Sequence, residues 1–112
     1  MKTALQIFEA NYGLEDVRTC KIKKNLALVY LRGNLFEEAL NELRQVEELE
    51  KLLFGESSSK LGKSQKIIGT LFIITGNTQE AREYLMQAHA IFESRGNLKQ
   101  LKETKQKLKM LN

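Results

Sequence analysis

Apolar residues recur along the chain at helical spacing, and polar residues fill the opposite sides of the same segments. This period predicts amphipathic helices, and no stretch shows the strict alternation of a half-buried strand. We therefore predict an all-α fold of five or six antiparallel helices. The predicted helices cover residues 1–12, about 16–32, 35–54, about 57–75, 78–94 and 98–111. The residues predicted to face the core include Cys20, Ala27, Tyr30, Leu31, Phe36, Ala39, Leu40, Leu43, Val46, Leu53, Ala81, Leu85, Ala88, Phe92, Leu101, Leu108 and Leu111.

Turn-forming residues separate the predicted helices. Gly13 and Gly55 are predicted stops, because glycine adopts the left-handed conformation that ends many helices. Glu15 or Asp16 is predicted to cap the second helix, and a serine of residues 57–59 the fourth. Gly-Asn pairs stand at residues 33–34, 76–77 and 96–97, and Glu37, Glu80 and Gln100 follow the respective asparagines by three residues. Each pair predicts a stop followed by an asparagine cap in a capping box.

The segment from Leu26 to Ala39 returns in degenerate form 42 residues downstream. The shift places Ile68, Gly69, Phe72, Gly76 and Ala81 on Leu26, Ala27, Tyr30, Asn34 and Ala39, respectively. A fixed period of roughly 20–50 residues is typical of a repeat array. The sequence therefore predicts at least two equivalent helical hairpins, and the period relates positions in one hairpin to positions in the other.

These residues resemble the tetratricopeptide repeat family. The order Leu26-Ala27-x-x-Tyr30, then a turn and an aromatic residue before Ala39, is similar to that repeat. The period and the segments 25–30 and 4–13 resemble the kinesin light chain type. The resemblance implies an α-solenoid of antiparallel hairpins in a right-handed superhelix. It implies a single domain over 1–112, with a partial repeat at 1–15, repeats at 16–56 and 57–96, and a terminal capping helix at 97–112.

Composition and charge place few further limits on function. The chain has 112 residues, a net charge of +4 and an isoelectric point near 9.2. This balance permits an acidic partner without requiring nucleic acid. Cys20 is the one cysteine, which fits a reducing compartment, and neither a secretory signal nor a membrane span is visible. We predict a cytoplasmic protein, and the resemblance leaves a cytoskeletal or ciliary association open.

No arrangement of residues predicts catalysis. His89 and Cys20, the one histidine and the one cysteine, fall on helices of different repeats. Metal ligands do not cluster, and no phosphate-binding loop surrounds the glycines. We therefore predict a protein that is not an enzyme, with no cofactor, no metal and no small-molecule substrate.

Basic residues gather on the first helix of each repeat. Their spacing of three residues places them on one side of each helix. In tetratricopeptide proteins the first helices line a concave groove that holds peptides, so the resemblance implies a basic groove. The candidate peptide-binding residues are Arg18, Lys21, Lys24, Asn25, Leu28, Lys60, Lys63, Lys66, Ile67, Thr70, Lys102 and Lys105. They predict an adaptor or scaffold that binds a partner peptide with acidic side chains around an apolar anchor.

Other interpretations of the same charges stay open. Lysine stripes are commonly solvated helix faces. Nucleic acid ranks low, because aromatic residues do not interleave with the lysines. Binding to a membrane surface ranks lower still, because no helix pairs a basic face with exposed bulky apolar residues. The alternative function is a structural assembly module, which self-associates or stacks within a longer protein through its terminal helices. The acidic helix 35–54 and the lysine-rich helix 98–111 motivate that alternative.

Overall fold

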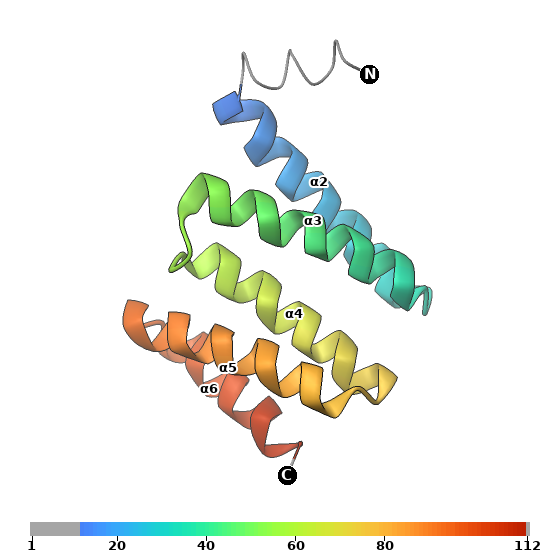
Figure 1. Cartoon of the computed structure of the whole chain (residues 1–112), viewed down its shortest axis with the longest axis vertical. Coiled ribbons are helices and arrows are strands. Elements are labelled where there is room, and N and C mark those ends of the chain that lie inside the picture. The colour runs from blue at the N-terminus through green and yellow to red at the C-terminus, as the bar shows by residue number, and fades with distance from the viewer. Residues whose placement is uncertain (1–11, 112) are drawn as a thin grey trace.

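The chain forms a stack of antiparallel helices (Figure 1). The computed structural model describes residues 12–111, with side chains from residue 17 onward. Within that range the elements are α2 (Tyr12–Arg32), α3 (Phe36–Phe54), α4 (Ser59–Thr75), α5 (Thr78–Arg95) and α6 (Leu98–Lys109), and none is a strand. The predicted all-α class is confirmed. The predicted helix over residues 1–12 lies almost entirely outside the described residues.

Two helical hairpins and a final helix make up the stack. Helices α2 and α3 form the first hairpin, α4 and α5 form the second, and α6 packs on α5. Helix α3 contacts α4, which joins the two hairpins. The hairpins correspond to the two copies of the 42-residue repeat. The repeat in the sequence is therefore also a repeat in space.

Small residues allow the helices of each hairpin to approach closely. A Cβ atom placed on Gly62 would lie 2.9 Å from Cε1 of Phe92, and one on Gly69 would lie 2.7 Å from Cγ of Leu85. The 42-residue shift places Cys20 and Ala27 at the equivalent positions of the first hairpin, and both are buried. The second hairpin is therefore packed too tightly at these positions for any side chain larger than hydrogen.

The hairpin turns follow the 42-residue register rather than the Gly-Asn pairs. Gly76 is left-handed at φ 84°, and the amide of the next residue donates to the carbonyl of Phe72 at 2.8 Å. In the first hairpin the left-handed residue is Asn34 at φ 61°, and the amide of Leu35 donates to Tyr30 at 2.8 Å. Asn34 is therefore the left-handed residue of the first turn, as Gly76 is of the second, since asparagine tolerates this conformation better than most side chains.

Several predicted caps are therefore wrong. Asn34 does not cap α3, because it is the left-handed residue of the turn and the N-cap position falls on Leu35. Asn77 occupies the N-cap of α5 but donates to Thr75 and makes no capping bond. Gly13 does not stop a helix, because α2 already begins at Tyr12 and a single glycine in a first turn costs only about 1 kcal/mol.

Other predicted boundaries are confirmed. The Oγ of Ser58 accepts from the amide of Leu61 at 3.1 Å, so this serine caps α4. Asn97 accepts from the amide of Gln100 at 3.4 Å and caps α6. The side chain of Gln100 does not complete a capping box, since its Oε1 accepts from Lys66 instead. Gly55 and Gly96 stand directly after α3 and α5, both with positive φ.

Candidate functional site

A concave pocket of about 310 Å³ lies where α2, the end of α3 and the start of α4 meet. Helix α2 presents residues three and four apart, which share one face of a helix. The turn between α3 and α4 brings the last residue of one helix close to the first residues of the next. The pocket is lined by Val17, Cys20, Lys21, Lys24, Asn25, Glu50, Phe54, Lys60 and Lys63.

The pocket combines an apolar part with cationic groups. Val17, Cys20 and Phe54 supply the apolar surface. The ammonium of Lys60 lies 4.4 Å from the centroid of the Phe54 ring, within the range of a cation–π interaction. This contact holds one positive charge beside the apolar surface and directly after the α3–α4 turn.

A buried carboxylate lies in the pocket wall. Glu50 is 2% exposed, and its Oε1 accepts from the hydroxyl of Ser64 at 2.5 Å. Its Oε2 lies 3.1 Å from the ammonium of Lys24, a hydrogen-bonded ion pair. A buried carboxylate needs such partners because burial removes its hydration. The positive charge of Lys24 is therefore largely offset within the protein itself.

Three further lysines leave the pocket basic. Within residues 17–111, no salt bridge involves Lys21, Lys60 or Lys63. All three side chains belong to exposed residues. Their charges act on the solvent in front of the pocket, where the surrounding protein lowers the effective dielectric constant. The arrangement suits an anionic group next to an apolar one.

The structure brings together five of the twelve predicted residues, namely Lys21, Lys24, Asn25, Lys60 and Lys63. Four of the others, which are Arg18, Leu28, Lys102 and Lys105, are exposed but lie outside this pocket. The basic positions on α6 therefore do not share the pocket with those on α2 and α4.

The remaining three predicted residues are engaged within the fold. Lys66 donates to Glu103 and to Gln100 of α6, both at 2.6 Å. Thr70 donates to the carbonyl of Lys66 at 2.8 Å, and Ile67 packs partly buried against the hydrophobic core. Lys66 therefore links α4 to α6, a role that the lysine stripe did not indicate.

Sequence reasoning missed the contribution of Glu50 and Phe54 to the pocket. A signal for Glu50 was present, because it continues the buried spacing of Ala39, Leu43 and Val46 on α3. A carboxylate in a core-facing position predicts a basic partner on a neighbouring helix. That partner is Lys24, 26 residues away in the sequence.

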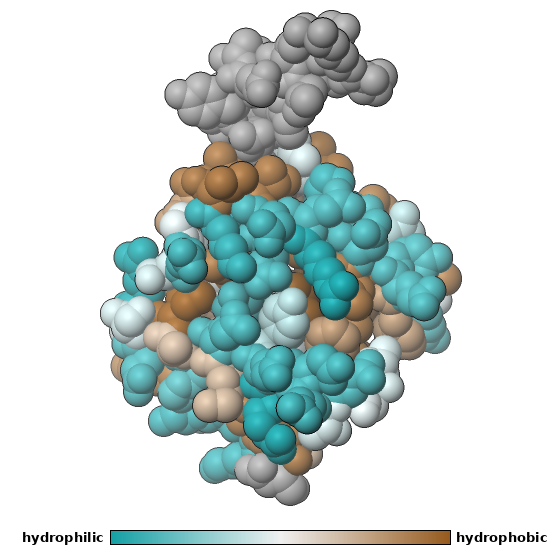
Figure 2. Space-filling model, in the orientation of Figure 1, coloured by the Kyte–Doolittle hydropathy of each residue, from teal (hydrophilic) through white to brown (hydrophobic). Residues whose placement is uncertain are grey.

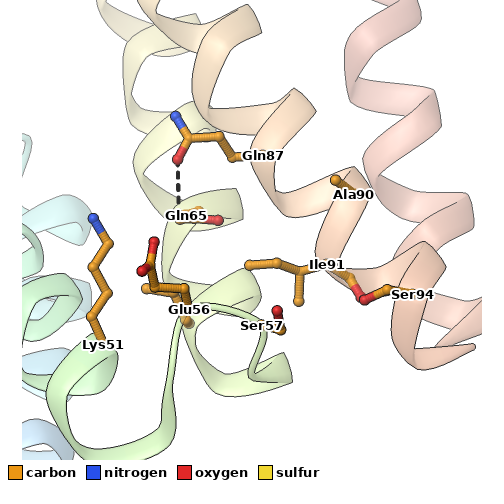
Figure 3. Close-up of a pocket in the computed structure, with 9 residues that line it drawn as sticks. Lys51, Glu56, Ser57, Gln65, Gln87, Ala90, Ile91 and Ser94 are labelled. Carbon is orange, nitrogen blue, oxygen red and sulfur yellow. Dashed lines mark hydrogen bonds between the residues drawn. The ribbon is translucent and has the colours of Figure 1, made fainter.

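A second pocket, of about 390 Å³, lies on another side of α4, between the α3–α4 turn and α5 (Figure 3). Gln65 donates to Gln87 at 3.1 Å across it. Its lining holds one residue of each charge, Lys51 and Glu56, and the ammonium of Lys51 lies 3.9 Å from a carboxylate oxygen of Glu47. None of the predicted site residues lines this pocket, and it has no excess of one charge.

The other side-chain groups offer little further chemistry. His89 lies on α5 and Cys20 lies buried on α2, in different hairpins. Among the residues that the structure describes, no three His, Cys, Asp or Glu side chains gather as metal ligands. In the same part of the chain, no helix is long and apolar enough to cross a membrane. Figure 2 shows hydrophilic residues over most of the visible face.

The repeated hairpins define the chain as a helical-repeat solenoid with a tetratricopeptide-like fold. A similar solved structure is the crystal structure of BtubC (BKLC) from P. vanneervenii, a kinesin light chain-like protein. It has a TM-score of 0.65 and 20% sequence identity, over 98% of this chain and 53% of that chain. This chain thus spans about half the length of that protein. No family model matches the sequence, and no curated protein matches it.

Proposed function

We propose that this chain is a non-enzymatic interaction module that binds an acidic peptide segment of a partner protein. The observation that carries the proposal is the pocket in which Lys21, Lys60 and Lys63 surround an apolar surface. Its volume of about 310 Å³ lies at the lower end of the range for ligand pockets. That size suits one apolar side chain with flanking groups, and a cytoplasmic location is part of the same proposal.

The ligand chemistry follows from the groups around the pocket. An apolar anchor of the peptide packs on Val17 and Phe54, and carboxylates on either side of it pair with the lysines. The amide of Asn25 is available for a hydrogen bond to the peptide backbone. Glu50 does not repel such a ligand strongly, because its charge is held by Lys24 and Ser64.

The concave shape favours this function over a plain solvated face. A solvated lysine stripe needs no apolar surface between its charges, yet this pocket places Phe54 under the ammonium of Lys60. Charges beside a low-dielectric wall attract an opposite charge more strongly than charges on an open helix. The helical-repeat fold also supports a role in binding other proteins.

A peptide titration tests the proposal. The probe is a fluorescein-labelled peptide with one leucine between glutamates, and fluorescence anisotropy measures its binding. We expect Lys21→Glu combined with Lys63→Glu to weaken binding by at least about tenfold, with a weaker dependence on salt. Lys99→Glu combined with Lys109→Glu is the matched control, because it makes the same charge change on exposed residues outside the pocket. Equal affinity of all three proteins contradicts the proposal.

A further inference from the structure

Gln65 on α4 carries a buried acceptor that lacks a donor. The residue is 2% exposed and lines the pocket of about 390 Å³ between the α3–α4 turn and α5 (Figure 3). We refer to this cavity as the Gln65 pocket. Within the described residues, the buried Oε1 of Gln65 accepts a hydrogen bond from no group. A buried carbonyl oxygen in this state costs free energy, and a ligand that brings a donor removes that cost.

The orientation of the Gln65 amide is determined by its neighbours. Its Nε2 donates to Oε1 of Gln87 at 3.1 Å and to a carboxylate oxygen of Glu47 at 3.4 Å. Figure 3 shows the oxygen of Gln87 facing Gln65. A reversed Gln65 amide would point its own oxygen at both of these acceptors. The unpartnered group is therefore an acceptor, and it selects a ligand with an N–H or O–H donor.

The 42-residue register shows that a glutamine is not needed here for packing. The register relates Gln65 to Lys23 in the first hairpin and to Lys107 in α6. Lys23 donates to Gln45 at 2.7 Å, and Gln45 is the equivalent of Gln87. The bond to the second helix of the hairpin is thus made by a lysine in one repeat and by a glutamine in the other. The glutamine adds an acceptor, because a lysine ammonium only donates.

The rest of the lining suits a neutral group on an aliphatic stem. Leu61 and Ile91 supply apolar wall, and the hydroxyl of Ser57 can donate to a carbonyl oxygen. The lining charges, Lys51 and Glu56, balance each other, so an ion gains no net attraction. The volume of about 390 Å³ lies within the range of ligand pockets.

We propose that the Gln65 pocket binds the side-chain carboxamide of a glutamine in a partner protein. The carboxamide N–H donates to Oε1 of Gln65, and the carboxamide oxygen accepts from Ser57. The two methylenes of the ligand pack on Leu61 and Ile91. The last torsion of a glutamine side chain is soft, so a small turn of the Gln65 amide presents its buried oxygen to the ligand.

Other ligand groups fit this pocket less well. A carboxylate has no N–H for the oxygen of Gln65, and an ammonium brings a charge that the balanced lining does not neutralise. The helical-repeat fold favours a protein as the source of the carboxamide. The Gln65 pocket shares no lining residue with the basic pocket, so this proposal does not depend on the function proposed above.

The test titrates short alanine peptides with one central glutamine into the isotope-labelled 112-residue chain. The side-chain amide signals of Gln65 and Gln87 in NMR spectra report on the pocket, and we expect both to shift until they saturate. Matched peptides carry methionine or glutamate in place of the glutamine. We expect both to bind at least about fivefold more weakly, because they leave the oxygen of Gln65 unpaired. Equal binding of the three peptides, or no saturable shift, overturns the proposal.

A free amide is distinguished from a partner protein by butyramide, which carries the same carboxamide and stem. We expect the glutamine peptide to bind at least as tightly as butyramide. Weaker binding of the peptide means that the pocket excludes a main chain, and that result overturns a partner protein as the source.

Gln65→Lys removes the acceptor and restores the residue of the equivalent repeat positions. Its ammonium can still donate to Gln87, as Lys23 does to Gln45, so we expect an unchanged circular dichroism spectrum. We also expect the affinity for the glutamine peptide, followed at the Gln87 signal, to fall at least about fivefold. Gln79→Lys is the matched control, since Gln79 is exposed and lies outside the pocket.

Ala90→Phe blocks the pocket without a change at Gln65. Ala90 lines the pocket but is exposed, so the larger side chain fills the cavity from the solvent side and leaves the core intact. We expect this variant to lose the saturable shift. Unchanged affinity in either folded variant overturns the proposal, whereas Lys21→Glu combined with Lys63→Glu, in the basic pocket, is expected to leave this binding unchanged.

Discussion

The ammonium of Lys24 on α2 lies 3.1 Å from a carboxylate oxygen of Glu50 on α3, in the wall of the basic pocket. The pair spans 26 residues, and the other oxygen of Glu50 accepts from Ser64 on α4. One carboxylate therefore joins three helices. It also determines how much of the positive charge of α2 reaches the solvent.

Removing the charge of Glu50 is expected to change stability and binding in opposite directions. Glu50→Gln keeps a group that accepts from Ser64 but leaves Lys24 without its anionic partner. We expect a loss of about 1–3 kcal/mol in the free energy of unfolding, measured by urea denaturation. We also expect tighter binding of the leucine–glutamate peptide, because Lys24 then adds its charge to the pocket. Glu48→Gln, at an exposed position of the same helix, is the control.

Acid is expected to weaken the link between α4 and α6. The hydrogen bond and charge of Lys66 hold the pKa of Glu103 below its ordinary value of 4.5. A carboxyl group with a lowered pKa in the folded state stabilises the fold above its unfolded pKa, and that contribution is lost as the pH falls through the folded pKa. Glu103→Gln should therefore destabilise the protein at pH 7, and this effect should shrink as the pH falls through the lowered folded pKa of Glu103. Urea denaturation across this pH range measures the difference, and a constant difference would contradict the assignment.

Gly69→Ala is expected to destabilise the second hairpin. The new Cβ would lie 2.7 Å from Cγ of Leu85 and 3.3 Å from the carbonyl oxygen of Ala81, so α4 and α5 must separate. Overpacking of this kind costs about 1–3 kcal/mol, which outweighs the gain of about 1 kcal/mol in helix propensity. Thermal unfolding measures the effect. Gly33→Ala serves as the control, since its Cβ would meet nothing closer than 3.7 Å.

The left-handed turn of the first hairpin gives a further prediction. Asn34→Gly should leave the free energy of unfolding unchanged or raise it slightly, because Gly76 has the same role in the second hairpin. Asn34→Leu should cost about 1–2 kcal/mol, since a larger side chain is strained at φ 61°. Denaturation of the two variants side by side tests this, and equal stability would argue against a left-handed residue at position 34.

The local apolar pattern and the 42-residue period were sufficient to predict the helices and how they pair into hairpins. The apolar spacing located α3 to α6 to within a residue or two, and Gly55, Gly76 and Gly96 located their ends. The repeated dipeptide Gly-Asn misled the interpretation of the first turn, because the two residues have different roles at positions 33–34 and 76–77. The period already aligned Asn34 with Gly76, and it was the better guide.

The basic pocket was harder to predict in detail. A charge stripe shows which lysines share a helix face, but not which of them have partners on other helices. Lys24 and Lys66 are engaged by Glu50 and Glu103, contacts that depend on how the hairpins stack. The ammonium of Lys60 is positioned by a cation–π contact with the ring of Phe54, on the other side of the α3–α4 turn. Contacts of this kind need side chains placed in three dimensions, and helical spacing alone does not supply them.

The junction between the two hairpins is hydrogen-bonded as well as packed. Glu50 meets Ser64, and Glu47 accepts from Gln65 at 3.4 Å, so two carboxylates of α3 face polar side chains of α4. Apolar contacts have no preferred direction, whereas a buried carboxylate displaced from its donor loses most of its stabilisation. The angle between successive hairpins, and with it the width of the basic pocket, is therefore held by a few directional bonds. A substitution at position 47 or 64 should therefore change ligand affinity indirectly, because it alters the angle between the hairpins and so the width of the basic pocket.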